Sequence, residues 1–236
     1  MIFDFHSHIL PGIDDGSSSL EESVELLRME ARQGIERVVA TPHFYPRHDS
    51  PERFLNRRHR AESVLREVIA DDNTLPRISV GAEVYFFPGI SDSDVLHQLT
   101  IDRKRCILLE MPQCPWQDSM YRELEGIYIK QGLTPIIAHV DRYIAPFRTY
   151  GIPERLEDLP VLVQANASFF LNRATAGMAI RMLKKGQIHL LGSDCHNLKH
   201  RPPRLGEACE VIEKRLGRQM LERLELNGRQ VLPDNQ

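Results

Sequence analysis

Residues 3–23, FDFHSHILPGIDDGSSSLEES, join a short apolar run to a polar segment that carries two histidines and two aspartates. The apolar residues at 1–5 predict a buried strand, and residues 19–34 predict an amphipathic helix. His6 and His8 lie between these two elements. This order predicts a βα unit with its metal-binding side chains at the carboxyl end of the strand.

The same succession of a short apolar run and a longer amphipathic segment recurs along the chain. Buried strands are expected at 1–5, 36–41, 77–84, 106–111, 134–139, 161–166 and 188–194. Helices are expected at 19–34, 51–70, 121–132, 174–186 and 205–217, with glycines 34, 132 and 186 at C-cap positions. Repeated strand–helix units favour parallel strands that close into a barrel-like α/β domain. No linker or repeat divides residues 1–236, so we expect a single domain.

Composition limits the class of protein. Lys and Arg number 30 against 33 Asp and Glu, a net charge of −3, which argues against nucleic-acid binding. The sequence contains no run of eighteen apolar residues, so membrane insertion is not expected. Asp4 and His6 lie at positions where a signal peptide has basic and then apolar residues. We therefore expect a cytoplasmic protein. The four cysteines form no CxxC pair, which favours reduced thiols.

Candidate metal ligands occupy one structural position throughout this pattern, the carboxyl end of a predicted strand. They are His6, His8, His43, Glu83, Glu110, His139, Asp194 and His196. In a βα barrel these ends converge on one face, so residues nearly 200 positions apart are expected to meet in one cleft. The paired spacing of His6 with His8, and of Asp194 with His196, places two ligands on one face of an extended strand.

The mixture of ligands indicates the metals. Imidazole and carboxylate without a well-placed thiolate suit Mn, Fe, Zn or Mg better than a structural zinc cage. Eight or nine ligands exceed the needs of one ion, so two or three ions are expected, with Glu83 as a bridging carboxylate. Such clusters lower the pKa of a bound water toward neutrality and clamp the oxygens of a hydrolytic displacement.

Six motifs carry a family resemblance: HSHILPGIDDG, ATPH, GAE, LLEMP, AHVDRY and GSDCHN, in order from residue 6 to 197. Together they resemble the polymerase-and-histidinol-phosphatase (PHP) superfamily. Within it, DDG, AHVDRY and SDCHNLKHRPP resemble the manganese-dependent tyrosine-protein phosphatases of bacterial capsular and exopolysaccharide operons. The resemblance implies a distorted (β/α)7 TIM-like barrel, three metal ions, and ligation by His6, His8, Asp15, His43, Glu83, Glu110, His139, Asp194 and His196. Asp14 is the alternative to Asp15.

Two arginines are the candidates for holding the substrate phosphate. The resemblance gives Arg142 this role, and a guanidinium beside a metal cluster can bind phosphate oxygens bidentately and stabilise transition-state charge. Arg201 is the second candidate. The family commonly has His-Pro-Glu-Arg where this chain has His-Val-Asp-Arg, so the role of Asp141 stays open.

The resemblance also implies the substrate and its source. The expected substrate is a phosphotyrosine in the tail of a bacterial tyrosine autokinase that controls polysaccharide chain length or export. The basic segments 56–63 (NRRHRAES) and 101–105 (IDRKR) are candidates for attracting this tail, or are solvated helix faces. The sequence does not predict the oligomeric state.

Three alternative functions remain at this point. One is a small-molecule phosphatase of the histidinol-phosphatase type. Another is a proofreading exonuclease, which the absence of a basic groove with aromatic residues disfavours. A third is a regulator that binds metal without turnover, which an open multi-metal site disfavours.

Cys195 and Arg201 imitate the Cys-x5-Arg spacing of thiol-based tyrosine phosphatases. That chemistry needs a tight phosphate loop, but no glycine lies between the two residues, and Pro202 and Pro203 follow them without backbone donors. Cys195 stands between Asp194 and His196, so strand alternation predicts that it points away from the cluster. We therefore expect Cys195 to be a buried core thiol.

Overall fold

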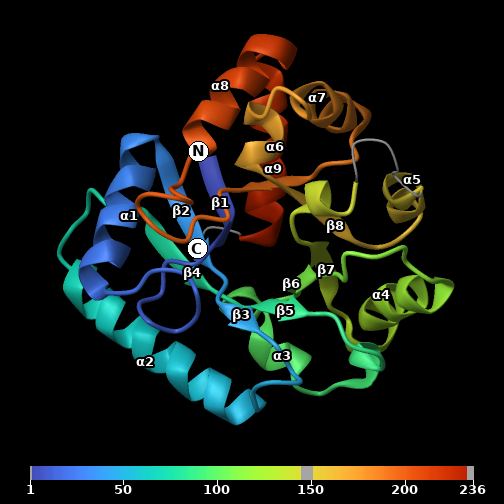
Figure 1. Cartoon of the computed structure of the whole chain (residues 1–236), viewed down its shortest axis with the longest axis horizontal. Helices are drawn as coiled ribbons and strands as arrows, with labels where there is room; N and C mark the ends of the chain where they lie inside the picture. Colours follow the sequence, from blue (N-terminus) through green and yellow to red (C-terminus); the bar gives the residue numbers. More distant parts are fainter. Residues whose placement is uncertain (1, 145–150, 233–236) are drawn as a thin grey trace.

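Parallel strands occupy the middle of the molecule, and helices surround them (Figure 1). The computed structural model describes residues 2–144 and 151–232. Its fold is mixed α/β, and the parallel strands form a curled surface rather than a flat sheet. None of the described helices is long and apolar enough to cross a membrane.

The strands belong to two sheets. One sheet has the order β1-β2-β4 and the other has the order β3-β5-β6-β7-β8-β9, and every pairing between named strands is parallel. Their bounds are β1 (Ile2–Ser7), β2 (Ile35–Ala40), β3 (His43–Phe44), β4 (Arg77–Val80), β5 (Glu83–Tyr85), β6 (Cys106–Glu110), β7 (Thr134–Ile137), β8 (Leu162–Asn166) and β9 (Leu190–Gly192).

Backbone hydrogen bonds link the two sheets at both sides. On one side β2 leads into β3 and β4 leads into β5, and the two connections are joined by bonds from the Gly81 N–H to the Ala40 carbonyl at 2.9 Å and from the Glu83 N–H to the Pro42 carbonyl at 3.0 Å. On the other side Ser7 forms a parallel bridge with Cys195, and the His8 N–H donates to the Cys195 carbonyl at 2.9 Å. The end of β1 therefore lies beside the segment that follows β9.

The helices are α1 (Leu20–Arg32), α2 (Pro51–Ile69), α3 (Leu96–Leu99), α4 (Asp118–Gln131), α5 (Ile152–Glu157), α6 (Ala167–Leu171), α7 (Ala176–Lys185), α8 (Leu205–Leu216) and α9 (Arg218–Val231). Local sequence explains where several of them begin and end. The Ser19 hydroxyl accepts the Glu22 N–H at the start of α1, and Ser50 caps α2 in the same way. Gly132 and Gly186 end α4 and α7 in the left-handed conformation that glycine adopts without strain.

The buried apolar side chains form two clusters. The smaller one lies inside the curled strands and includes Phe5, Leu108, Ile136 and Leu190, together with Leu232 at the end of α9. The larger cluster fills the space between the strands and the surrounding helices. Because α9 packs its end against the amino end of β1, the carboxyl ends of the strands are left to build a site.

The predicted strands and the five predicted helices coincide with observed elements to within a few residues, Met1 lying outside the described residues. The prediction of one strand over 77–84 was wrong, because Gly81 and Ala82 belong to no strand and separate β4 from β5. The strand partners change at this point, since β4 pairs with β2 whereas β5 pairs with β3 and β6. Four helices, α3, α5, α6 and α9, and the short strand β3 were not predicted.

Candidate metal centre

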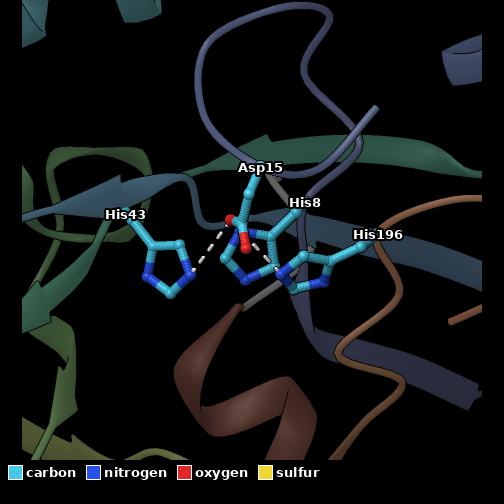
Figure 2. A group of neighbouring side chains, drawn as sticks. All are labelled: His8, Asp15, His43 and His196. Carbon is cyan, nitrogen blue, oxygen red and sulfur yellow. Dashed lines mark ion pairs between the residues drawn. The ribbon is translucent and has the colours of Figure 1, made fainter. Parts of the chain in front are cut away.

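The carboxyl ends of the strands bring all nine predicted metal ligands into one cluster. Three groups have ligand atoms within 4.8 Å of one another: His8, Asp15, His43 and His196; His6, His8 and Asp194; and His43, Glu83 and Glu110. His139 joins them through Glu83, at 2.8 Å from Nε2 to Oε1. In Figure 2 the Asp15 carboxylate lies between the rings of His43 and His196.

Glu83 is the centre of this cluster. Its Oε2 atom lies 3.1 Å from His6 Nε2, 3.3 Å from His8 Nε2 and 3.0 Å from His43 Nδ1. It nevertheless makes no hydrogen bond of acceptable geometry, although the side chain is buried. A buried carboxylate oxygen without a donor is costly unless a cation satisfies it.

His6 and His8 face each other through their Nε2 atoms, which are 3.1 Å apart. The other ring nitrogen of each histidine has an acceptor: Gln164 Oε1 lies 3.3 Å from His6 Nδ1, and Asp14 Oδ2 lies 2.8 Å from His8 Nδ1. When both rings are neutral, each carries its proton on Nδ1 and donates it to these acceptors. The lone pairs of the two Nε2 atoms then point at each other. This arrangement fits a metal cation between the ligands and the outer hydrogen bonds that orient metal-bound histidines.

Asp14 and Asp15 have different surroundings. The Asp14 side chain is only 7% exposed, and its carboxylate also accepts the backbone N–H groups of His43 at 2.9 Å and Gly16 at 3.0 Å. The Asp15 side chain is 68% exposed and lies 3.5 Å from His43 Nε2 and 3.6 Å from His196 Nε2. Asp14 therefore orients His8, whereas Asp15 is the aspartate whose oxygen is placed among the other candidate ligands.

Two side chains of β8 support the cluster and were missed by the sequence reasoning. Gln164 Oε1 accepts the His139 N–H at 2.6 Å as well as facing His6, and its Nε2 donates to Asn166 Oδ1 at 3.0 Å. Asn166 Nδ2 donates to Asp194 Oδ2 at 2.9 Å. One amide pair thus orients three candidate ligands. The signal was two buried polar residues at i and i+2 near the end of the apolar run 161–166.

Two candidate ligands adopt left-handed backbone conformations. His139 has φ 32° and Asp194 has φ 54°, which cost energy for residues other than glycine. The left-handed conformation of His139 is stabilised by the hydrogen bond from its N–H to Gln164. That of Asp194 is stabilised by the hydrogen bond from its N–H to the His6 carbonyl at 2.7 Å. Because Asp194 is not extended, the argument that strand alternation pairs it with His196 was wrong in its geometry, although both side chains reach the cluster.

The carboxylates create a strongly negative environment. Burial disfavours a charged imidazole, but Asp14 and Glu83 raise the pKa of His8 to about 10. Burial also opposes ionisation of Glu83, yet His6 and its other imidazole neighbours hold the pKa of this carboxyl well below its ordinary value. Positive charge is therefore strongly favoured among these side chains, and a divalent cation supplies it without protons on the rings.

Arg142 and Arg201 both lie at the edge of the cluster. Arg142 Nη2 is 2.5 Å and Arg201 Nη2 is 2.8 Å from Asp194 Oδ2. The two guanidinium groups line a hollow of about 260 Å³ together with Arg204 and the side chain of Asp141. Asp141 accepts the Asn166 backbone N–H at 3.1 Å, and burial raises the pKa of its carboxyl. The hollow is suited to an anion.

Cys195 points away from the metal centre, as predicted. It is fully buried and lies with Asp4 of β1 and Glu30 of α1. Burial, followed by the charges of Glu30 and Asp4, raises the pKa of the Cys195 thiol well above its ordinary value. A thiol in this setting is a poor nucleophile.

A family model described as "Capsular polysaccharide synthesis, CpsB/CapC" matches residues 2–232. Among similar proteins, the tyrosine-protein phosphatase CpsB of Streptococcus pneumoniae is 29% identical, with 99% of both chains covered. The tyrosine-protein phosphatase YwqE of Bacillus subtilis is 28% identical over 93% of this chain and 87% of its own.

The fold is also similar to a solved structure from work on YwqE of Bacillus subtilis and CpsB of Streptococcus pneumoniae, described as unique metal-dependent tyrosine phosphatases. The TM-score is 0.86 at 24% identity, with 100% of this chain and 96% of that chain covered. At this level of identity, the comparison supports the mixed α/β fold with its curled parallel sheet.

Proposed function

Because the chain belongs to the CpsB/CapC family of capsular polysaccharide synthesis, we propose that it is a metal-dependent protein-tyrosine phosphatase. Relatives that are named tyrosine-protein phosphatases align with almost the whole chain, which supports this activity. The proposed substrate is a phosphotyrosine in the tail of a tyrosine autokinase that governs capsular or exopolysaccharide synthesis.

The observation that carries the proposal is the convergence of imidazole nitrogens on Glu83 Oε2, which has no hydrogen bond. Two or three manganese ions, with Fe, Zn or Mg as alternatives, would be held by His6, His8, Asp15, His43, Glu83, Glu110, His139, Asp194 and His196. When bound, such ions polarise the phosphoryl group and activate water for attack on phosphorus.

The arginines of the site would bind the substrate phosphate. Arg142 and Arg201 approach one oxygen of Asp194 from the edge of the cluster, and both remain partly exposed, at 30% and 38%. Their N–H groups can turn to phosphate oxygens and stabilise the charge that develops in the transition state. Asn166 keeps a separate hydrogen bond to Asp194, so the carboxylate stays oriented when the arginines bind substrate.

The structure gives no support for the suggestion that the basic segments 56–63 and 101–105 attract the phosphorylated tail. Residues 101–105 precede β6, so they lie at the amino ends of the strands and not beside the cluster. Within 56–63, Arg58 is buried and donates to the carbonyls of Gly81 and Gln98 at 2.8 Å each. Recognition of the tail is therefore assigned to surfaces at the carboxyl ends of the strands.

We further propose that the two curled sheets together form one distorted (β/α)7 barrel, and that residues 1–236 form a single domain. The bridge between Ser7 and Cys195 supports this proposal, because it joins β1 of the first sheet to the segment that follows β9, the last strand of the second. The cytoplasmic location, like the absence of nucleic-acid binding, stays a prediction.

The test is hydrolysis of one peptide carrying either phosphotyrosine or phosphoserine, compared with histidinol phosphate, by metal-stripped and manganese-loaded protein. The proposal predicts that manganese restores turnover and that phosphotyrosine gives the largest kcat/KM. Preference for histidinol phosphate would favour the small-molecule phosphatase. Stoichiometric metal binding without turnover of any of the three compounds would favour the regulator.

A further inference from the structure

A second hollow adjoins the metal centre at the carboxyl ends of β3, β5 and β6. Its volume is about 640 Å³, within the range of roughly 300–1,000 Å³ that is typical of sites for small organic ligands. Tyr45, Tyr85, Phe87 and Pro112 are among the aromatic, prolyl and other apolar residues that make up most of its lining, which also includes Arg47 and Glu123.

A row of rings connects this hollow to the candidate metal ligands. The rings of His43 and Tyr45 are stacked, with centroids 5.0 Å apart and planes inclined by 25°. The Tyr85 ring follows, 5.7 Å from that of Tyr45. The Tyr45 hydroxyl lies 3.1 Å from His43 Nδ1 and donates to Glu110 Oε2 at 3.4 Å. Tyr45 therefore both lines the hollow and contacts two candidate metal ligands, His43 and Glu110.

Hydrogen bonds fix the walls of the hollow. The Phe86 N–H donates to the Glu110 carbonyl at 2.9 Å, which ties the end of β5 to the end of β6. The Glu123 carboxylate of α4 accepts the backbone N–H groups of Gly89 and Ser91 at 3.0 and 2.9 Å. Tyr45 remains 36% exposed between these fixed segments. A preformed apolar wall of this kind binds a ligand without the cost of ordering it first.

The two hollows differ in chemistry and lie over different strands. Three arginines, Arg142, Arg201 and Arg204, line the hollow beside β7, β8 and β9. Most residues that line the hollow beside β3, β5 and β6 are aromatic, prolyl or otherwise apolar, and Arg47 is the one arginine among the described residues there. A ligand that has its anionic phosphate at the metal centre gains free energy when its apolar group packs against the aromatic and prolyl side chains of the second hollow. Aromatic rings favour tilted and offset contacts of the kind already present between Tyr45 and Tyr85.

We propose that the hollow lined by Tyr45, Tyr85 and Phe87 is the subsite for the phosphotyrosine ring and for the residue next to it in the substrate peptide. This inference rests on the proposed phosphatase function and adds the feature that selects an aryl phosphate over an alkyl phosphate. Phosphoserine has no ring to lie along the row from His43 to Tyr85, so it gains nothing from these side chains.

Two variants test the subsite from opposite directions. Phe87→Ala enlarges the hollow, and Ser119→Trp fills it from the exposed start of α4 without disturbing the core. Tyr128→Ala is the matched control, because Tyr128 is an aromatic residue of the same helix that is 48% exposed and outside the hollow. Each protein is loaded with manganese and assayed on the phosphotyrosine and phosphoserine forms of one peptide.

Both hollow variants are expected to raise KM for the phosphotyrosine peptide by about tenfold or more, the scale of losing contacts in an apolar pocket. Their kcat/KM for the phosphoserine peptide, their bound manganese and their inhibition by inorganic phosphate should match wild type, as should all properties of Tyr128→Ala. Unchanged KM for phosphotyrosine in both variants would refute the subsite alone. Failure of manganese-loaded wild type to hydrolyse phosphotyrosine would refute the proposed function itself.

Discussion

Replacement of Asp14 by asparagine tests whether Asp14 acts by orienting the metal ligand His8, without binding the metal itself. Both oxygens of Asp14 accept hydrogen bonds, Oδ1 from the Gly16 N–H and Oδ2 from the His43 N–H, with His8 Nδ1 also 2.8 Å from Oδ2. An asparagine has only one oxygen. In either orientation of its amide, an NH2 group would face at least one backbone N–H.

The expected cost follows from these contacts. Leaving one buried donor unsatisfied lowers the free energy of unfolding by ~1–3 kcal/mol, which for a chain of this size corresponds to a fall in Tm of roughly 2–12 °C. The His8 Nδ1–H either keeps a neutral amide oxygen in place of the carboxylate or, with the NH2 group at the Oδ2 position, has no acceptor, so the ring is held less firmly with a free Nε2 lone pair. Loss of such an orienting group weakens metal affinity by about 10–100-fold.

The assay is calorimetric titration of metal-stripped protein with Mn²⁺, together with thermal unfolding of the same metal-free sample. Asp15→Asn is the matched control, because its side chain is 68% exposed and faces only His43 and His196 among the ion pairs of the described residues. Asp15→Asn should weaken manganese binding with almost no change in Tm. If Asp14→Asn instead left both the Tm and the affinity at wild-type values, the orienting role would be wrong.

Three further substitutions test other parts of the site. Arg142→Ala should lower kcat by about 100-fold or more, the scale of one lost transition-state donor, with bound manganese unchanged; recovery of kcat with excess metal would make Arg142 a support for Asp194 instead. Gln164→Ala should weaken manganese binding by about 10–100-fold in calorimetry, and an unchanged affinity would show that the Gln164–Asn166 pair does not orient the ligands. Cys195→Ala should keep most phosphatase activity, while a chelator should abolish wild-type turnover until manganese is restored; an inactive variant with full metal content would return the thiol mechanism to consideration.

The sequence predicted the positions of the strands because each is a short apolar run bounded by polar residues. Parallel strands then brought His8 and His196 together at one edge from distant parts of the chain. Helix α9 was not predicted, although Val231 and Leu232 at its end are buried against the inside of the sheet. The position of α9 depends on this tertiary contact, which the local pattern of apolar residues does not indicate.

The supporting groups of the site were harder to predict than the candidate ligands. Gln164 and Asn166 lie in an apolar run and have no metal-binding signature, so only the folded chain shows that they contact His6, His139 and Asp194. The left-handed backbone at His139 and Asp194 likewise has no local signal, because neither residue is glycine. The surrounding hydrogen bonds impose both conformations.

Manganese anomalous scattering tests the central claim most directly. From crystals of the manganese-loaded protein, data collected at the manganese absorption edge should give anomalous peaks in contact with Glu83, His6 and His8, and with Asp15, His43 and His196. No peak is expected at the buried group formed by Asp4, Glu30 and Cys195. Peaks confined to that group, or a fully occupied manganese site elsewhere with none beside Glu83, would contradict the assignment of the metal centre.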